Sequence, residues 1–487
     1  MGALEEFLKE RPEYARTSAL DALRAAEYGR LDAEGHIYLD YTGGGLHAVS
    51  QTREHAELLN AHVFGNPHSS SLSSTKTTAL VEEARRLVLA WFNTSASEYT
   101  AIFTANATGA LKEVGEAFPF EHGGSFLATF DNHNSVNGIR EFALAKGARV
   151  DYAPLTMPDL RVDVPELEAR LAAAPPGGRR LFAFPAQSNF SGVKHPLVLV
   201  KRAQALGWHV LLDAAAFVPT NRLDLSEVQP DFVAISFYKM FGYPTGVGCL
   251  LVRNAALPLL ARPWFAGGTV NFASVQGLAH FLSPREAGFE DGTLNYLGIP
   301  AVTIGLRHLE RIGLDVIQTR VQCLTAWMLG RLLSLSHRNG RPMVRIYGPT
   351  TVEERGGTIT FNLYDPDGHL LDYRRIEELA TDRRISIRTG CFCNPGAGET
   401  AEGLTEEDML AGAAAGADMT LPRFLQVIQH RGGKSAGAIR ASLGLASNFA
   451  DVEAFLEFVS GFRDQTRLTM GEVTFDIASC RIIRDGS

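Results

Sequence analysis

The feature that most constrains the fold is an alternation of short apolar runs with helical patterns from about residue 98 to about residue 255. Seven of the runs are β-prone: TAIFTA, SFLATF, RVDYAPL, RLFAFPA, HVLLDA, DFVAIS and GVGCLLV. Strands buried on both faces of a sheet are almost continuously apolar, as HVLLDA and GVGCLLV are. Between the runs, LVLVKRAQALG has the apolar spacing of a crossover helix that ends at a glycine. The sequence therefore predicts an α/β fold with a mainly parallel, seven-stranded sheet.

After about residue 300 the pattern changes to long helical stretches, followed by β-like GGTITFNLY and RRISIRTG, which predict a second, smaller α+β domain. A chain of 487 residues has room for two cores, because single cores usually stop growing at about 250–300 residues. We expect an amino-terminal segment over 1–65 that packs with the small domain, a large domain over 66–305 and a small domain over 306–487. Within the small domain, a stretch rich in Gly, Ala and Glu at about 394–430 predicts an insertion or flap.

Composition and charge exclude several classes of partner. The formal net charge is −8, and the sequence has no run of basic residues that could bind along a phosphate backbone, which argues against a nucleic-acid partner. The amino terminus mixes charges and lacks a signal-peptide pattern, and no apolar run reaches the roughly 20 residues needed to span a bilayer. Five cysteines are too few for a disulfide scaffold, so reduced thiols are expected. These features predict a cytoplasmic protein that binds neither nucleic acid nor membrane.

Polar side chains follow several of the predicted strands. In an open α/β sheet, residues at the carboxyl ends of strands line the ligand crevice, which selects His133, Asp213 and Ser236. Lys239 comes three residues after Ser236, ahead of a loop rich in Gly and Pro. Burial there would lower the pKa of the amine and allow it to form an imine with a carbonyl cofactor. The alternative is a surface lysine whose stem covers apolar side chains.

A buried carboxylate and a polar helix start are suited to binding a cofactor that has a cationic aromatic ring and a phosphate. Asp213 closes a strand predicted to be buried, so its carboxylate requires a cationic partner such as a pyridinium nitrogen; alternatively it caps a helix. The segment FTANATGALKEVGEAF begins a helix where a strand ends, and backbone N–H groups at such a position bind phosphate. Thr108 is the hydroxyl expected there, with Ser236 as a second phosphate ligand.

Three other residues have both a functional and a structural interpretation. His133 could stack on the cofactor ring and move protons, or be a structural histidine. Asn189 could donate a hydrogen bond to a phenolic oxygen of the cofactor, or shape a turn. Arg440 could clamp a substrate carboxylate in a bidentate manner, or form a surface ion pair.

Cys391 and Cys393 begin a segment rich in Gly and Pro directly after a β-like run, which predicts an exposed loop. The nearby Arg388 would favour a thiolate, the species that attacks sulfur. Two cysteines one residue apart provide half of a tetrahedral zinc site, and no second pair completes it, so we expect no metal. A disulfide at this spacing is geometrically unattractive. Cys393 is the nucleophile we select.

These residues, taken in chain order, resemble the site of the class V, fold-type-I enzymes that use pyridoxal 5'-phosphate (PLP), and specifically the cysteine desulfurases: Thr108, His133, Asn189, Asp213, Ser236, Lys239, Arg388, Cys393 and Arg440. The motifs YLDYTGGG, FGNPHSSS, FPAQSNFSGVKHP, LLDAAAFVPT, ISFYKMFGYPTGVG and RTGCFCNPGA are similar to the amino-terminal desulfurase domain of molybdenum-cofactor sulfurases. The match covers most of the chain.

The resemblance implies a site built around PLP, held by Lys239 as a Schiff base, with a persulfide formed on Cys393. It implies these cofactor-binding residues: Ala107, Thr108, His133, Asn189, Asp213, Ser236, Tyr238, Lys239 and Thr293. It implies a substrate-binding set of Arg440, Arg388 and His68. It also implies a homodimer, in which Thr293 reaches the phosphate bound by the neighbouring subunit.

The chain departs from the family pattern at three positions. Tyr238 stands where desulfurases usually have histidine, and Ala216 where many have glutamine; both suit the cofactor-sulfurase branch. Gly398 stands where cofactor sulfurases often have a further cysteine, which puts the final sulfur acceptor in doubt.

The sequence thus predicts a cysteine desulfurase that converts L-cysteine to L-alanine and passes sulfur through Cys393 to an acceptor protein, for molybdenum-cofactor sulfuration. The first alternative is a class V PLP enzyme that acts on another amino acid as a C–S lyase, epimerase or aminotransferase, because one fold hosts many chemistries. The second is a degenerate PLP-fold protein that serves as a partner subunit. A screen of amino acids for changes in the spectrum of the bound cofactor distinguishes the first alternative from a cysteine desulfurase. Purified protein that stays colourless after PLP is supplied favours the second alternative.

Overall fold

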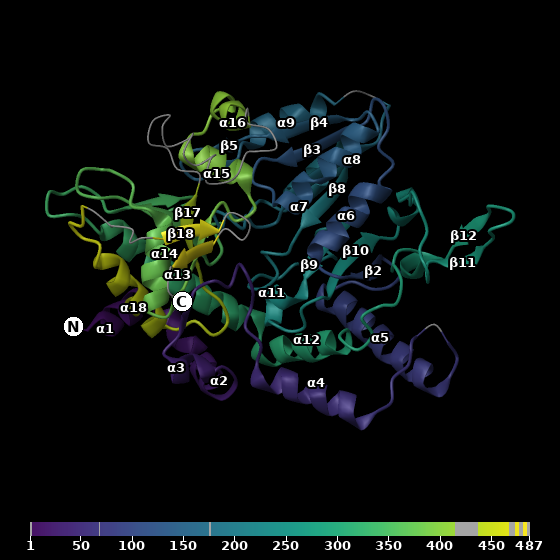
Figure 1. The fold of residues 1–487 in the computed structure, drawn as a ribbon, viewed down its shortest axis with the longest axis horizontal. Helices are drawn as coiled ribbons and strands as arrows, with labels where there is room; N and C mark the ends of the chain where they lie inside the picture. Colours follow the sequence, from purple (N-terminus) through teal and green to yellow (C-terminus); the bar gives the residue numbers. More distant parts are fainter. Residues whose placement is uncertain are drawn as a thin grey trace.

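The computed structural model describes residues 2–67, 69–174, 177–413, 437–466, 473–476 and 481–484 (Figure 1). Its largest sheet has seven strands, in the spatial order β2 (Tyr99–Thr104), β10 (Gly248–Arg253), β9 (Phe232–Ser236), β8 (His209–Asp213), β7 (Arg180–Pro185), β3 (Ser125–Thr129) and β4 (Arg149–Ala153). β10 is antiparallel to both of its neighbours, β2 and β9, and the other six strands all run in the same direction. The predicted mainly parallel, seven-stranded sheet is confirmed, and each of the seven apolar runs overlaps one of its strands.

Helices cover both faces of this sheet, which explains why its strands are apolar throughout. In β10, Leu250 packs into one core, whereas its neighbours Cys249 and Leu251 pack into another, because successive side chains of a strand point to opposite faces. The Leu250 face carries α6 (Ala107–Ala117), α7 (Asn134–Asn137) and α8 (Ile139–Ala145). The other face carries α5 (Leu72–Trp91), α9 (Val164–Ala172), α10 (Val198–Ala205) and α12 (Pro300–Ile312). The expected crossover helix is α10, and Gly207 just beyond it has a φ of +79°.

A second, antiparallel sheet lies to the left in Figure 1 and has the order β13 (Val344–Tyr347), β14 (Thr358–Leu363), β17 (Ala438–Ser442) and β16 (Arg388–Gly390). Three helices accompany it: α13 (Leu314–Ser334), α14 (Tyr373–Asp382) and α18 (Phe449–Ser460). The predicted smaller α+β region is confirmed. Strand β17 connects β14 to β16, so residues on either side of position 400 in the sequence share this sheet.

Three amino-terminal helices, α1 (Ala3–Glu10), α2 (Ala19–Glu27) and α3 (Arg30–Glu34), precede an extended segment that reaches the smaller sheet, and α4 (Val49–Ala61) follows it. In that segment β1 (Ile37–Tyr38) pairs in parallel with β15 (Ile385–Ser386), and Asp40 forms a parallel bridge with Ser442. Strand residues some 350–400 positions apart therefore lie side by side.

The remaining elements are short. Hairpin strands β5 (Leu155–Thr156), β6 (Arg161–Val162), β11 (Val270–Ala273), β12 (His280–Leu282), β18 (Val473–Asp476) and β19 (Arg481–Arg484) form three two-stranded sheets, and β11–β12 projects at the right of Figure 1. The predicted insertion begins with α15 (Pro395–Glu402) and α16 (Glu406–Ala413), and its part beyond residue 413 lies outside the described residues. Within the described ranges, every helix is too short or too polar to cross a bilayer.

Candidate active site

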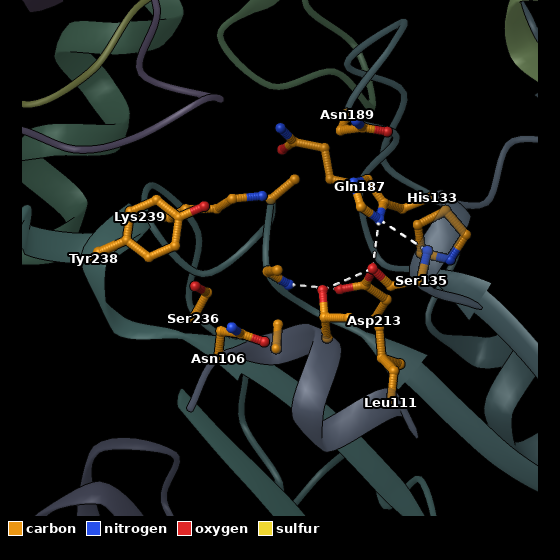
Figure 2. A pocket seen from close by; sticks show the side chains of 15 residues that line it. Asn106, Leu111, His133, Ser135, Gln187, Asn189, Asp213, Ser236, Tyr238 and Lys239 are labelled. Atoms are coloured by element: carbon orange, nitrogen blue, oxygen red, sulfur yellow. Dashed lines mark hydrogen bonds between the residues drawn. The ribbon is translucent and has the colours of Figure 1, made fainter. Parts of the chain in front are cut away.

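A pocket of about 220 Å³ opens at the carboxyl ends of the central strands. Side chains from β8, β9, the loop after β3 and the start of α6 surround the same space (Figure 2). The sequence selected eight of the pocket residues: Ala107, Thr108, His133, Asn189, Asp213, Ser236, Tyr238 and Lys239. Strand topology brings them together, because parallel strands end at the same edge of the sheet.

Lys239 enters the pocket because the chain turns sharply after β9 into the short helix α11 (Phe237–Phe241). Gly242 ends that helix with a φ of +79°, and a Cβ atom there would lie 2.2 Å from the backbone nitrogen of His47. The close approach of the amino-terminal segment thus requires glycine at 242. Desolvation by the surrounding protein lowers the pKa of the Lys239 amine, and the nearby Asp213 carboxylate opposes this shift. The alternative of a surface lysine is therefore wrong.

Asp213 is the last residue of β8 and is only 9% exposed. Its Oδ1 accepts a hydrogen bond of 3.0 Å from the backbone N–H of Ala215. Its Oδ2 has no hydrogen-bond partner in the described part of the chain, although the residue lines the pocket. A carboxylate oxygen that lacks a protein partner at the edge of a pocket favours a cationic group in that pocket. The helix-cap alternative does not hold, since a turn follows Asp213.

The amino terminus of α6 forms one wall of the pocket. The Asn106 side chain caps this helix by accepting a 2.9 Å hydrogen bond from Gly109 N–H. The N–H groups of Ala107 and Thr108 have no acceptor among the described residues and belong to the first turn, which attracts anions. Gly248 of β10 makes this approach possible, since a Cβ there would lie 2.4 Å from the Asn106 backbone.

His133 is held in one orientation at the start of α7. Its Nδ1 accepts a hydrogen bond of 3.1 Å from Ser135 N–H, so the neutral ring carries its proton on Nε2. Burial lowers the pKa of His133, while the Asp213 carboxylate acts in the opposite direction. Ser135 Oγ in turn lies 2.7 Å from Thr108 Oγ1, which links the histidine to the α6 wall.

The two arginines predicted to bind a substrate carboxylate both form ion pairs with the same residue, Asp40. Arg440, 2% exposed on β17, donates from Nη2 to Asp40 Oδ1 at 3.0 Å and from Nη1 to Asn189 O at 3.0 Å. Arg388 donates from Nη2 to Asp40 Oδ2 at 2.5 Å. Neither arginine lines the pocket, and the Nε of Arg440 has no partner within the described ranges. Desolvation lowers the pKa of Arg440, and Asp40 opposes the shift.

The cysteine pair begins the loop between β16 and α15. Cys393 is exposed and Cys391 is half-buried, and neither forms a disulfide. The backbone of Cys393 lies beside the histidine, because Asn134 N–H donates to Cys393 O at 2.7 Å. Asn189 Nδ2 donates to Phe392 O at 2.7 Å, so this predicted cofactor ligand also contacts the loop. The predicted loop is present, but it is exposed only at Cys393, because the flanking Phe392 and Asn394 are buried.

Some predicted residues lie elsewhere, and some pocket residues were not predicted. Thr293 is exposed, accepts a 3.2 Å hydrogen bond from Asn66 and lines a different cavity. His68 lies outside the described residues. Sequence reasoning missed three polar pocket residues and one arginine partner: Asn106, Ser135, Gln187 and Asp40. All four stand within one or two positions of a selected residue or inside a quoted motif, but only their spatial contacts identify them.

The model of the aminotransferase class-V family matches residues 37–455. The molybdenum cofactor sulfurase of Solanum lycopersicum is 38% identical over 491 residues, an alignment that covers 93% of this chain and 59% of that protein. The apo cysteine desulfurase of Thermococcus onnurineus NA1 superposes with a TM-score of 0.73 at 23% identity, covering 91% of this chain and 97% of that one. The cystine C–S lyase C-DES, solved with glycine covalently linked to its PLP cofactor, has a TM-score of 0.67 at 17% identity and coverages of 90% and 98%.

The architecture is thus the one found in cysteine desulfurases and in C-DES, with the pocket at the carboxyl edge of its sheet. The chain belongs to the aminotransferase class-V family. It spans about three fifths of the length of the sulfurase from Solanum lycopersicum.

Proposed function

We propose that this protein is a PLP-dependent cysteine desulfurase that takes sulfur from L-cysteine onto Cys393 and releases L-alanine. The observation that carries the proposal is the pocket itself, in which a desolvated lysine and a carboxylate with one unpartnered oxygen face an unsatisfied helix amino terminus. The exposed Cys393, whose backbone is hydrogen-bonded beside His133, supports the choice of sulfur chemistry.

The residues present fit PLP. Lys239 would bond the aldehyde, and Asp213 Oδ2 would balance a protonated ring nitrogen, which would supply a partner for this oxygen. The phosphate would take the free N–H groups of Ala107 and Thr108, together with the hydroxyls of Thr108 and Ser236. When bound, PLP supplies an electron sink for charge that develops on the substrate's α-carbon.

The protein's own groups would move the protons. Its lowered pKa leaves more of the Lys239 amine neutral, the form that acts as a base or nucleophile. The His133 ring, fixed through Nδ1, would present Nε2 for proton transfer. We propose Tyr238 and Asn189 as further cofactor contacts, because both line the pocket.

The sulfur would leave on the protein. Cys393 Sγ bonds to the sulfur of cysteine while the C–S bond of the substrate breaks, and the carbon skeleton departs as alanine after protonation. Cysteine and a thiol thereby give alanine and a persulfide, without an external oxidant. Arg440 and Arg388 stay the predicted carboxylate-binding residues, with Asp40 as their present partner. His68 is proposed with them from the sequence alone.

The experiment compares two cysteines two positions apart. Purified protein given L-cysteine and a reductant should yield sulfide and alanine in equal amounts. Cys393→Ala should abolish sulfide release while the protein keeps its yellow cofactor, and Cys391→Ala, the matched control, should retain both. Undiminished sulfide release by Cys393→Ala would reject the persulfide role, and turnover of other amino acids in place of cysteine would favour a lyase, epimerase or aminotransferase.

We propose molybdenum-cofactor sulfuration as the destination of the sulfur. The support is the 38% identity to a molybdenum cofactor sulfurase over 93% of this chain. A separate acceptor protein is proposed to receive the sulfur, as the sequence predicted. Persulfide transfer from Cys393 to a purified candidate acceptor, detected by mass spectrometry, tests this step.

A homodimer is proposed as well, with Thr293 of each copy contacting the phosphate bound by the other. The exposed position of Thr293, outside its own chain's pocket, supports this arrangement. We also propose that the chain divides into an amino-terminal segment, a large domain and a small domain at about residues 65 and 305. The two separate sheets support the division between the large and small domains. The pairing of β1 with β15 supports the packing of the amino-terminal segment with the small domain. The cytoplasmic location stays a prediction from the sequence.

A further inference from the structure

Asn394 directly follows Cys393, and its side chain uses every hydrogen-bonding group it has. It is 0% exposed. Its Nδ2 donates to Asp131 O at 2.7 Å and to Asn189 Oδ1 at 2.9 Å, and its Oδ1 accepts from Ala397 N–H at 3.2 Å. One amide thus connects the cysteine loop to two segments of the pocket and to the first turn of α15.

The two segments it reaches are those that carry site residues. Asp131 lies two residues before His133, and Asn189 lines the pocket. Asn189 returns a hydrogen bond of 2.7 Å to Phe392 O, and Asn134 N–H donates to Cys393 O at 2.7 Å. The loop is therefore held by bonds on both sides of the cysteine.

The conformation of the loop explains why it needs to be held. Phe392 and Cys393 both have a φ of +55°, in the left-handed region that residues with a side chain rarely adopt. The Arg440 guanidinium lies 4.6 Å from the centre of the Phe392 ring and covers it. At the far side, Gly396 lets α15 approach Phe130, whose backbone oxygen would be 2.0 Å from a Cβ at 396. Two successive strained residues persist only where surrounding contacts fix them.

We propose that Asn394 is a positioning residue that fixes the Cys393 loop to the cofactor pocket, so that the thiol meets the substrate's sulfur in one orientation. This inference rests on the proposed desulfurase function. The alternative is that Asn394 serves only as the cap of α15. The two roles use different atoms: the cap uses Oδ1 as an acceptor, whereas the attachment to the pocket uses Nδ2 as a donor.

Asn394→Asp separates the two roles. Aspartate caps helices as well as asparagine does, but it cannot donate to Asp131 O or to Asn189 Oδ1. Asn339→Asp is the matched control, because Asn339 also donates from Nδ2 to a backbone oxygen, that of Pro366, at 2.7 Å and accepts from Arg341 N–H, but lies on an exposed loop away from the site. Both variants are made in the full chain and loaded with PLP.

Two measurements decide the matter. Amide hydrogen exchange over residues 388–396 and at Asn134 should become about tenfold faster in Asn394→Asp, because buried donors and acceptors lose their partners. The kcat for sulfide release from cysteine should fall about tenfold or more, while the KM changes less than about threefold and the cofactor absorbance is retained. Asn339→Asp should match the unaltered protein in every measurement.

Unchanged amide hydrogen exchange in the cysteine loop of Asn394→Asp would overturn the proposal. A fall in sulfide release that is explained entirely by loss of bound cofactor would also overturn it. If the unaltered protein makes no sulfide from cysteine, the proposed function fails, and the exchange measurement still decides whether Asn394 holds the loop. Should the added charge prevent folding, Asn394→Ser gives the same comparison, since serine caps a helix and lacks the amide donor.

Discussion

The floor of the pocket and the cysteine loop are positioned by different means. Asp213 and Ser236 end buried strands of the central sheet and are 9% and 2% exposed. Cys393 is exposed, follows a three-residue strand and has a left-handed backbone held by hydrogen bonds from other segments. The sheet thus positions Asp213 and Ser236, the proposed cofactor-binding residues, through its own hydrogen bonds, whereas the proposed nucleophile Cys393 depends on a few polar contacts. Removing Lys239 or the charge of Asp213 should therefore lower turnover more than loosening the contacts that hold the cysteine loop.

The largest effect is expected at the lysine. Lys239→Ala should lower cysteine turnover by about 10⁴-fold or more, because it removes both the attachment of the cofactor and a proton-transfer group. Lys201→Ala, on the exposed surface of α10, is the control and should leave turnover unchanged. Steady-state kinetics of alanine formation measure both variants. Substantial turnover by Lys239→Ala would contradict the proposed role of Lys239 in catalysis.

The next effect is expected at the partner of the ring nitrogen. Asp213→Asn keeps the shape of the side chain and its bond to Ala215 N–H but loses the charge, so kcat should fall about 10²- to 10³-fold. Asp163→Asn, which preserves the cap of α9, should have no effect. Kinetics and the absorbance of the bound cofactor provide the readout. Equal kcat for Asp213→Asn and the unaltered protein would contradict the assigned role.

The sequence predicted the floor well and the loop only in part, for a physical reason. Asp213 and Ser236 end strands, and Lys239 follows three residues after Ser236; strands leave a local apolar pattern in the sequence. The contact of Arg440 with Asp40 joins residues 400 positions apart, and Asn189 meets Phe392 across 203 positions. No local pattern encodes such pairs.

Contacts between residues far apart in the sequence also explain why the surroundings of Arg388, Gln187 and Ser135 were not predicted. Arg388 was expected to act on the cysteines, but its charge is engaged by Asp40, a residue that only the three-dimensional pairing of β1 with β15 brings near. Gln187 and Ser135 stand beside selected residues, yet their side-chain directions depend on the turns after β7 and β3.

A smaller effect is expected at the phosphate ligands. Ser236→Ala should weaken PLP binding about tenfold, since a hydrogen bond to a charged group contributes about 1.5–3 kcal/mol. The control is Ser125→Ala, a buried serine at the opposite end of the sheet whose hydroxyl has no partner in the described part of the chain. Fluorescence titration of the cofactor-free proteins with PLP gives the affinities. An unchanged dissociation constant for Ser236→Ala would place the phosphate elsewhere.

The smallest effect is expected in the pH dependence of stability. Because burial lowers the pKa of His133, the unfolded chain binds the proton first as the pH falls below about 6.5, and folding loses stability down to the folded pKa. Above about pH 6.5 the residue has no such effect. The cofactor-free protein should therefore lose unfolding free energy between pH 7 and 5 more steeply than His133→Gln. Parallel curves from urea unfolding would contradict the burial of this ring.

The most direct test of the central assignment is reduction of the PLP-loaded protein with borohydride, followed by peptide mapping. The predicted result is a phosphopyridoxyl group on Lys239, in the peptide that contains ISFYKMFGYPTGVG. A modified lysine elsewhere, or no modified peptide at all, would contradict the account.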